Sequence, residues 1–430
     1  MKRRAWLAVA AGAVVAGLVA FARPAVDGSA FVPKPGTYDV RILRDRWGVP
    51  HVFGKTDAAT AYGLGFAHAE DDYATIEEAL LQSRGTSAAK VGQEAAPIDY
   101  IVQLLRVRET VEKEFETQLS PEVRAVCQGY ADGVNHWAAL HPDKVAAGVL
   151  PYTAHDIVAG FYFKSPFFFG VDNAVKSLMG SSRPGEVSQR NDEAAGDSTG
   201  QTTMVGDAVE GLAATRRWLT ADMPVGSNTF AVSPKRSADG STMLNINSHQ
   251  PWDGVVAWYE AHLVSDEGWD VVGGTFPGAP VILHGHNRHL GWAHTVNKPD
   301  LVDIYVLDIN PDNANQYRLD GQWRDFEVGT AKINVKLWGP ISWTFNRETL
   351  WCAYGPAIRT DHGVYAVRYA GLGDIRQVEQ WYRMGKATSY DEWLDAVRMQ
   401  GFASFNIAYA DATGTIGYFY NARMPKRHPG

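Results

Sequence analysis

The chain has 430 residues, of which 45% are hydrophobic and 11% aromatic, enough for a large hydrophobic core. Its formal net charge of −8 argues against a nucleic-acid-binding protein, and no basic stripe stands out. Two cysteines, Cys127 and Cys352, exclude a disulfide framework; one bridge between them is compatible with an oxidising compartment, but the sequence does not show that they meet.

Residues 1–22 predict a secretory signal peptide that is cleaved near Ala22. A basic start, MKRR, precedes an apolar run that is rich in small residues and ends in Ala-Phe-Ala. An uncleaved anchor helix is the alternative, although the run is short for a membrane span. No other segment is long and apolar enough to cross a bilayer. We therefore expect a soluble mature protein, periplasmic or secreted, with no membrane contact after signal removal.

The next region, residues 23–180, predicts a hairpin followed by helices. Residues 37–54 alternate in two runs around a turn, and from about residue 57 to residue 140 the periodicity is helical. Ser120 and Pro121 are typical of an N-cap and the first helical position. Residues 153–156 begin another helix, which leads into the aromatic block FYFKSPFFFG at 161–170. We expect most of these rings in the core.

Residues 181–226 are polar and read as a linker. They contain a G-x-S-x-G pattern at 196–200, which is also the signature of the nucleophile elbow of serine hydrolases. That elbow needs a strand before it and a helix after it. Both flanks here are polar and low in apolar residues, so we do not assign the pattern a catalytic role.

The residue pattern changes at Gly226-Ser227, from the polar linker to predicted strands. Residues 228–232 and 242–246 predict two strands of a hairpin. Glycine leaves its carbonyl unhindered, so Ser227 Oγ could attack it and cut the chain between Gly226 and Ser227. The new terminal serine would hold a hydroxyl nucleophile and an α-amine with a pKa near ~8, suited to act as general base. By itself the dipeptide would only indicate a turn before a strand.

Four histidines crowd residues 284–294, and they raise the alternative of a zinc hydrolase. They are His284, His286, His289 and His294. Alternation along a strand would put the first two on one face, but there is no H-E-x-x-H motif and no cysteine partner. A metal-dependent hydrolase is therefore a secondary hypothesis.

Several long motifs resemble one family. The stretch GSNTFAVSPKRSADGSTMLNINSHQPW at 226–252 is similar to the start of the β-chain in the penicillin acylase family of N-terminal nucleophile hydrolases, most of all in the branch with acyl-homoserine lactone and aculeacin acylases. Three further stretches resemble the family in the same order: YDVRILRDRWGVPHVFGKTDAATAYGLGFAHAEDD, GGTFPGAPVILHGHNRHLGWAHTVNKPDLVDIYVLD and FNIAYADATGTIGYFYNARMPKR.

This resemblance implies an α+β fold, a four-layer αββα sandwich with a helical α-chain region. Residues 23–180 would be the α-chain, 181–226 an excised spacer and 227–430 the β-chain, giving an αβ heterodimer from one precursor. Relatives continue for a few hundred residues beyond the last matching stretch. The C-terminal part of the fold is therefore expected to be missing, which leaves maturation of this length of chain open.

The resemblance also implies the catalytic residues. Ser227 would be the nucleophile, and His249 would orient and tune its α-amine. The backbone N–H of Val296 and the side-chain amide of Asn406 would form the oxyanion hole. An amide suits that place because it donates a hydrogen bond without titrating.

Further positions follow from the resemblance alone. The aromatic helix would line the acyl pocket, with Phe163, Phe167 and Phe168 as candidates, and Arg427 falls where penicillin acylases have a pocket arginine. Asp300, Val302 and Asp303 resemble a loop that binds a structural calcium ion, and hard oxygen ligands suit calcium. The family's glutamate ligand is not at the matching position, where Gly170 falls with Asp172 close by, and the homoserine lactone branch often lacks this site.

The implied function is deacylation of N-acyl amides with an apolar acyl group, of the acyl-homoserine lactone or lipopeptide type, through an acyl-enzyme. The chemistry needs no cofactor. The alternatives are a β-lactam acylase of the penicillin or cephalosporin type, and an inactive truncated relative that only binds acylated ligands. The expected partner is a small-molecule substrate and not a nucleic acid.

Overall fold

A computed structural model describes residues 31–146, 148–178, 226–339 and 341–427. The predicted signal peptide and residues 181–225 of the predicted spacer lie outside these ranges. No helix of the described part combines the length and the apolar character that crossing a bilayer requires.

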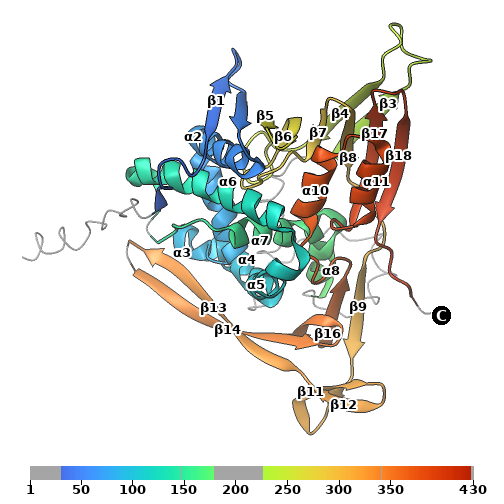
Figure 1. Cartoon of the computed structure of the whole chain (residues 1–430). Coiled ribbons are helices and arrows are strands. Elements are labelled where there is room, and N and C mark those ends of the chain that lie inside the picture. Colours follow the sequence, from blue (N-terminus) through green and yellow to red (C-terminus); the bar gives the residue numbers. More distant parts are fainter. Residues whose placement is uncertain (1–30, 147, 179–225, 340, 428–430) are drawn as a thin grey trace, which may run out of the picture.

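The N-terminal region forms the predicted hairpin and helices (Figure 1). Strands β1 (Val40–Arg44) and β2 (Pro50–Gly54) pair antiparallel. The helices are α2 (Asp57–Arg84), α3 (Ala88–Val91), α4 (Ala96–Leu104), α5 (Val107–Gln118), α6 (Pro121–Leu140), α7 (Ala154–Lys164) and α8 (Val171–Leu178), with a 3₁₀ turn η4 (Ser165–Phe169) after α7. The predicted cap of α6 is confirmed, because the Ser120 side chain accepts a hydrogen bond from the Val123 N–H.

Helices α2 and α6 cross at a contact that only glycine permits. A Cβ atom on Gly65 of α2 would lie 2.2 Å from the Tyr130 carbonyl oxygen, and one on Gly133 of α6 would lie 2.1 Å from the Tyr62 carbonyl oxygen. No side chain fits at such distances, so the two backbones approach directly. Helix α7 packs against both members of this pair, which fixes its place in the fold.

The main sheet joins strands from both sides of the predicted spacer. Its order is β1-β2-β5-β6-β7-β8-β17-β18, and every neighbouring pair is antiparallel except β2 and β5. The added strands are β5 (Tyr259–Ser265), β6 (Asp270–Thr275), β7 (His284–Asn287), β8 (Leu290–Thr295), β17 (Ser404–Asp411) and β18 (Ile416–Ala422). The parallel β2–β5 contact therefore ties the predicted α-chain to the predicted β-chain.

The two faces of this sheet have different neighbours. Side chains alternate along β17, so Phe405 and Tyr409 meet Trp381 of α10 (Gln377–Lys386) and Trp393 of α11 (Tyr390–Arg398) on one face. The other face carries the predicted hairpin, β3 (Gly226–Val232) and β4 (Met243–His249), which contacts β8 and β17. The fold is α+β as predicted, and these layers are helices, sheet and sheet. In the described ranges no helix makes a substantial contact with the hairpin, so the fourth layer stays a prediction.

A second, five-stranded sheet has the order β13-β14-β15-β16-β9. Its strands are β9 (Val302–Leu307), β13 (Glu327–Trp338), β14 (Ile341–Cys352), β15 (Gly355–Thr360) and β16 (Gly363–Tyr369), and β10 (Ile309–Asn310), β11 (Asn313–Leu319) and β12 (Gln322–Asp325) form a small separate sheet. The long hairpin β13–β14 lies along α3 and α4 (Figure 1). Both cysteines are free: Cys127 is buried in α6 and Cys352 ends β14.

Candidate active site

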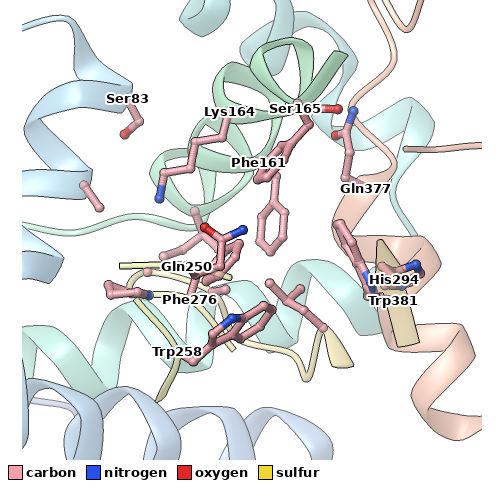
Figure 2. A pocket seen from close by; sticks show the side chains of 18 of the residues that line it. Ser83, Phe161, Lys164, Ser165, Gln250, Trp258, Phe276, His294, Gln377 and Trp381 are labelled. Atoms are coloured by element: carbon pink, nitrogen blue, oxygen red, sulfur yellow. Dashed lines mark hydrogen bonds between the residues drawn. The ribbon is translucent and has the colours of Figure 1, made fainter. Parts of the chain in front are cut away.

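A cavity separates α7 from the strands that carry the predicted catalytic residues (Figure 2). Its empty volume, which includes open solvent at the mouth, is about 930 Å³. One side is a single face of α7 and η4, because the lining positions recur every three or four residues. They are Asp156, Ile157, Gly160, Phe161, Lys164, Ser165 and Phe168.

Of the three aromatic residues predicted for the pocket, the structure brings only Phe168 to the cavity wall. Phe163 is 1% exposed and packs edge-on against Phe167, and neither lines the cavity. Phe161 lines it instead. The correction follows from helix geometry: Phe161 and Phe168 are seven residues apart and share a face, whereas Phe163 points to the opposite side of α7.

Ser227 lies at the meeting point of two hollows. It is the second residue of β3, lines the α7 cavity, and also lines a more open depression formed with Thr295 and Tyr418. In the uncut chain its Oγ donates a hydrogen bond to the carbonyl oxygen of Gly226, at 2.5 Å. The predicted nucleophile therefore already contacts the carbonyl group of the predicted cleavage bond.

The two predicted oxyanion donors come from neighbouring strands. Val296 directly follows β8 and lines the cavity with Ser227, while Asn406 on β17 pairs with Thr295, the residue before Val296. Asn406 Nδ2 donates to Thr295 Oγ1 at 3.0 Å, and its Oδ1 accepts from Tyr418 Oη at 2.7 Å. The tyrosine contact fixes the amide orientation, so the N–H₂ group points toward the β8 side.

His249 lies beside the predicted cleavage bond but faces away from the nucleophile. It pairs with Gly226 across the hairpin, whereas Ser227 pairs with Ser248. Directly opposite residues share a face, and successive residues alternate, so the imidazole lies on the other face from Ser227 Oγ. His249 is exposed, and its Nε2 lies 3.2 Å from Asn228 Nδ2.

The histidine-rich stretch divides between the surface and the cavity. His286 and His289 are exposed, but His284 and His294 both line the cavity with ring centroids 5.2 Å apart. Trp381 Nε1 donates to His294 Nε2 at 3.0 Å. Burial lowers the pKa of His284 to about 3 and holds the pKa of His294 well below its ordinary value, so both are neutral at pH 7. In the described ranges no three His, Cys, Asp or Glu side chains are grouped to hold a metal ion, so the zinc alternative has no site there.

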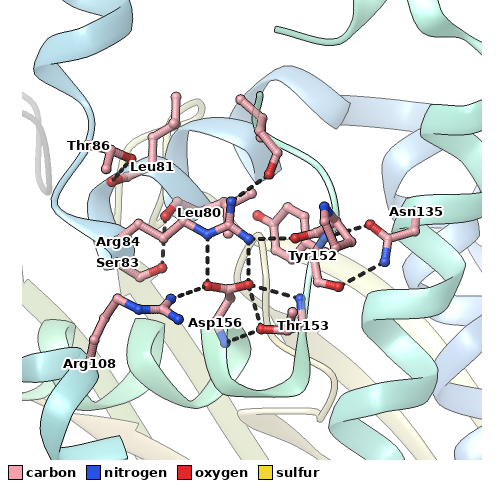
Figure 3. A network of polar contacts seen from close by, with 12 residues as sticks. Leu80, Leu81, Ser83, Arg84, Thr86, Arg108, Asn135, Tyr152, Thr153 and Asp156 are labelled. Atoms are coloured by element: carbon pink, nitrogen blue, oxygen red, sulfur yellow. Dashed lines mark hydrogen bonds and ion pairs between the residues drawn. The ribbon is translucent and has the colours of Figure 1, made fainter. Parts of the chain in front are cut away.

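Asp156 lines one end of the cavity, and its buried carboxylate is the centre of an ion network with two partly exposed arginines (Figure 3). Arg84 donates to both carboxylate oxygens of Asp156, at 2.9 and 2.7 Å, and Arg108 adds a third contact at 2.7 Å. The N–H and hydroxyl of Thr153 complete the shell in a capping box at the start of α7. Burial opposes ionisation, but the hydrogen bonds from Arg84 outweigh it and lower the pKa of Asp156.

The predicted calcium-binding loop forms ion pairs with an arginine, Arg427. Arg427 contacts Asp303 Oδ1 at 2.8 Å and Asp300 Oδ2 at 3.1 Å, and it also donates to the Asp300 carbonyl oxygen. Val302 begins β9 and pairs with Tyr369. A guanidinium thus occupies the oxygens that a calcium ion would need, and calcium binding would have to displace it. Arg427, which we expected in the substrate pocket, does not line the cavity.

Several lining residues were not singled out from the sequence. Ser248 and Gln250 reach the cavity from the end of β4, Gln377 and Trp381 reach it from α10, and Lys164 reaches it from α7. No local motif marks α10, which lies 150 residues after the predicted nucleophile in the sequence. Helical periodicity along residues 156–168 puts Phe161 and Lys164 on one face of the helix and Phe163 on the opposite face. This periodicity could have identified the first two residues from the sequence.

The chain is similar in sequence to known amidases and acylases. A family model described as penicillin amidase matches residues 39–430. The chain is 26% identical to an acyl-homoserine lactone acylase PvdQ from Pseudomonas fluorescens (strain Pf0-1), over 96% of this chain and 54% of that protein. It is 26% identical to aculeacin-A acylase from Actinoplanes utahensis, over 93% of this chain and 52% of that protein.

A third similar protein is penicillin acylase 2 proenzyme from Pseudomonas sp. (strain SE83), 25% identical over 94% of this chain and 55% of that protein. Among solved structures, thermostable penicillin G acylase from Alcaligenes faecalis matches with 30% identity and a TM-score of 0.41, over 45% of this chain and 35% of that chain. The chain spans about half the length of the curated relatives it matches. Because the family model covers most of its residues, the chain belongs to the penicillin amidase family.

Proposed function

We propose that this protein is a self-processing serine N-terminal nucleophile amidohydrolase that deacylates N-acyl amides through an acyl-enzyme. One observation carries the proposal: Ser227, the second residue of β3, lies where an apolar cavity meets a more open depression, and Val296 lines the same cavity. The cavity suits an acyl group, and the depression suits the departing amine. Family membership supports the same chemistry.

Maturation would begin at the contact between Ser227 Oγ and the Gly226 carbonyl group. The oxygen attacks the carbonyl carbon and the C–N bond breaks, while the hydroxyl proton ends on the Ser227 nitrogen. The product is an ester. Water then hydrolyses this ester to a Gly226 carboxylate, a free hydroxyl and a free α-amine. With a second cut in the spacer, the precursor becomes an αβ heterodimer.

Turnover then uses the same serine. Its α-amine, with a reference pKa near ~8, accepts the hydroxyl proton as Oγ attacks the substrate carbonyl carbon. The Val296 N–H and Asn406 Nδ2 stabilise the oxyanion, and the protonated amine leaves. Water releases the carboxylic acid from the acyl-enzyme. We assign His249 the orientation of the α-amine from the far face of the hairpin.

For the substrate we propose N-acyl amides of the acyl-homoserine lactone or lipopeptide type, since relatives named for these activities match over nearly the whole chain. A β-lactam acylase is the second candidate, which one further relative supports. We also propose export to the periplasm or medium. A structural calcium ion at Asp300, Val302 and Asp303 stays a prediction, to be checked by the melting temperature with and without a chelator.

The function is tested by intact mass and N-terminal sequencing of the exported protein, followed by amine release from the three substrate types. A fragment that begins Ser227-Asn228-Thr229, together with turnover, supports the proposal. An uncut chain that binds acylated ligands without turnover would instead identify a binding-only relative.

Asn406→Ala is expected to lower kcat by about 10²–10³, the usual effect of losing one oxyanion donor. Steady-state kinetics on the processed enzyme would measure it. Tyr418→Phe is the matched control, because it removes only the hydrogen bond to Asn406 Oδ1 and leaves the amide donor in place. We expect a smaller loss there, and full turnover in Asn406→Ala would remove this residue from the mechanism.

Gly160 is expected to control the length of acyl group that the cavity accepts. It lines the cavity in the middle of α7, and a Cβ there would meet nothing within 4 Å. Gly160→Leu should shift the preference toward shorter acyl groups in a kcat/KM series. Gly160→Ala, the control, should raise the unfolding free energy by about 1 kcal/mol through helix propensity. An unchanged length preference in Gly160→Leu would contradict this assignment.

A further inference from the structure

The long hairpin β13–β14 is anchored along its length, and its far end extends past α3 (Figure 1). The Gln103 side chain of α4 binds both backbone groups of Lys332: its oxygen accepts from the Lys332 N–H at 2.9 Å, and its nitrogen donates to the Lys332 carbonyl oxygen at 3.1 Å. Ile333 and Val335 are buried in a cluster with residues of α3 and α4. Beyond Val335 the described side chains of both strands are exposed. The anchored part therefore holds an exposed tip in place.

The exposed tip carries large apolar side chains. Trp338 is 77% exposed and pairs across the hairpin with Ile341, which is also exposed. Trp343 is 61% exposed, and Leu337 is exposed beside Trp338. Apolar side chains gathered on a surface mark a site of contact with a protein or a membrane. Tryptophan is enriched where the hydrocarbon of a membrane meets water, because its ring is apolar and its N–H is polar.

The charge of this hairpin is opposite to that of the whole protein. The chain carries a formal net charge of −8, yet residues 328–347 contain three basic residues and no acidic one. Two of the three, Lys332 and Lys336, are exposed, and neither has an ion-pair partner among the described residues. The 3₁₀ turn η2 (Gln93–Ala95), which contacts β13, adds one carboxylate, Glu94. The surface thus keeps a net positive charge, and an anionic partner is its electrostatic complement.

We propose that the tip of this hairpin, residues 336–338 and 341–343, docks on the surface of an anionic phospholipid bilayer. The apolar side chains of the tip enter the interfacial layer, while Lys332 and Lys336 contact lipid phosphates. The charge disfavours a self-complementary dimer through this surface, because two facing tips would repel each other. The inference goes beyond the proposed function and does not depend on it.

This docking differs from what the sequence led us to expect. The expectation of no membrane contact was based on the absence of a second segment long enough to cross a bilayer. A hairpin tip that lies in the interface needs no such segment, since it enters only the headgroup region. Exposure of the tip is decided by tertiary packing, which buries Ile333 and Val335 and leaves Trp338 and Trp343 uncovered.

Co-sedimentation of the full chain with lipid vesicles tests the docking. One vesicle contains phosphatidylcholine alone, and the other contains phosphatidylcholine mixed with anionic phosphatidylglycerol. We expect binding to the mixed vesicles to be about tenfold tighter and to weaken as salt is added, because salt screens the lysine–phosphate attraction. No binding to either vesicle, or equal binding to both, overturns the proposal.

Variants of the tip identify the contact. Lys332→Gln and Lys336→Gln should each weaken binding to the mixed vesicles about fivefold. The double variant Trp338→Ser with Trp343→Ser should weaken it about tenfold or more through lost apolar contact. Trp47→Ser is the matched control, because Trp47 is 76% exposed at the turn between β1 and β2. Wild-type binding in the double variant and in both lysine variants overturns the proposal.

Sedimentation velocity without vesicles tests a second copy of the chain as the occupant. The same association state in wild type and in the tryptophan double variant supports the membrane. A wild-type dimer that the double variant dissociates would identify a protein contact and overturn the docking. Because all substituted side chains are exposed, we expect unchanged denaturant unfolding, and the lysine variants test the docking even if the double variant does not fold. None of these measurements needs turnover, so their failure leaves the proposed function standing.

Discussion

Ser227→Ala is expected to leave one uncut chain and to lower amide turnover by about 10⁶-fold, the scale seen when a serine hydrolase loses its nucleophile. The reason is that one oxygen serves both steps. Without Oγ nothing attacks the Gly226 carbonyl carbon, so the α-amine of residue 227 is never freed, and no acyl-enzyme forms. Intact mass, N-terminal sequencing and amine release measure the two effects separately.

Ser248→Ala is the matched control for the cut. Ser248 pairs directly with Ser227 across the hairpin and lines the same cavity, so the change removes a similar hydroxyl from the same wall. We expect this variant still to yield a fragment that begins at Ser227. Cleavage between residues 226 and 227 in Ser227→Ala would show that another protease makes the cut.

Asp156→Ala is expected to lower the free energy of unfolding by about 3–5 kcal/mol, because it removes the buried carboxylate that pairs with Arg84 and Arg108 and leaves the mostly buried Arg84 without a counter-ion. Loss of the capping box at Thr153 adds to the effect. Denaturant unfolding measures it. The control is Asp395→Ala, since Asp395 forms an exposed pair with Arg398, and such pairs contribute about 0–1 kcal/mol. A loss below about 1 kcal/mol in Asp156→Ala would contradict this account.

The same network predicts a pH dependence. The pKa of Asp156 is lower in the folded protein than its ordinary value of about 3.9. The stabilisation is therefore fully present above that ordinary value and is lost as the pH falls through the lower folded pKa. We expect the stability difference between wild type and Asp156→Ala to shrink in acid, while it stays constant near neutral pH.

Much of the local structure follows from the sequence. Alternation and turn residues predict the hairpins at 37–54 and 228–246, and Ser120 with Pro121 predicts the start of α6. These features depend on residues close together in the chain, where backbone preferences and capping act directly. The family could also be predicted, because four long motifs recur in order. The candidate nucleophile Ser227 could also be predicted from the sequence, because the pattern changes there from a polar linker to a predicted strand within a few residues.

Tertiary structure decided which of these side chains meet. It turned Phe161 and not Phe163 to the cavity, brought His284 and His294 together, and paired Arg427 with Asp303 more than a hundred residues away. It also placed Trp381 of α10 beside His294. Such contacts depend on how helices rotate and pack against a sheet built from both ends of the chain. Short-range patterns predict an element and its apolar face, but the packing of distant elements fixes what each side chain touches.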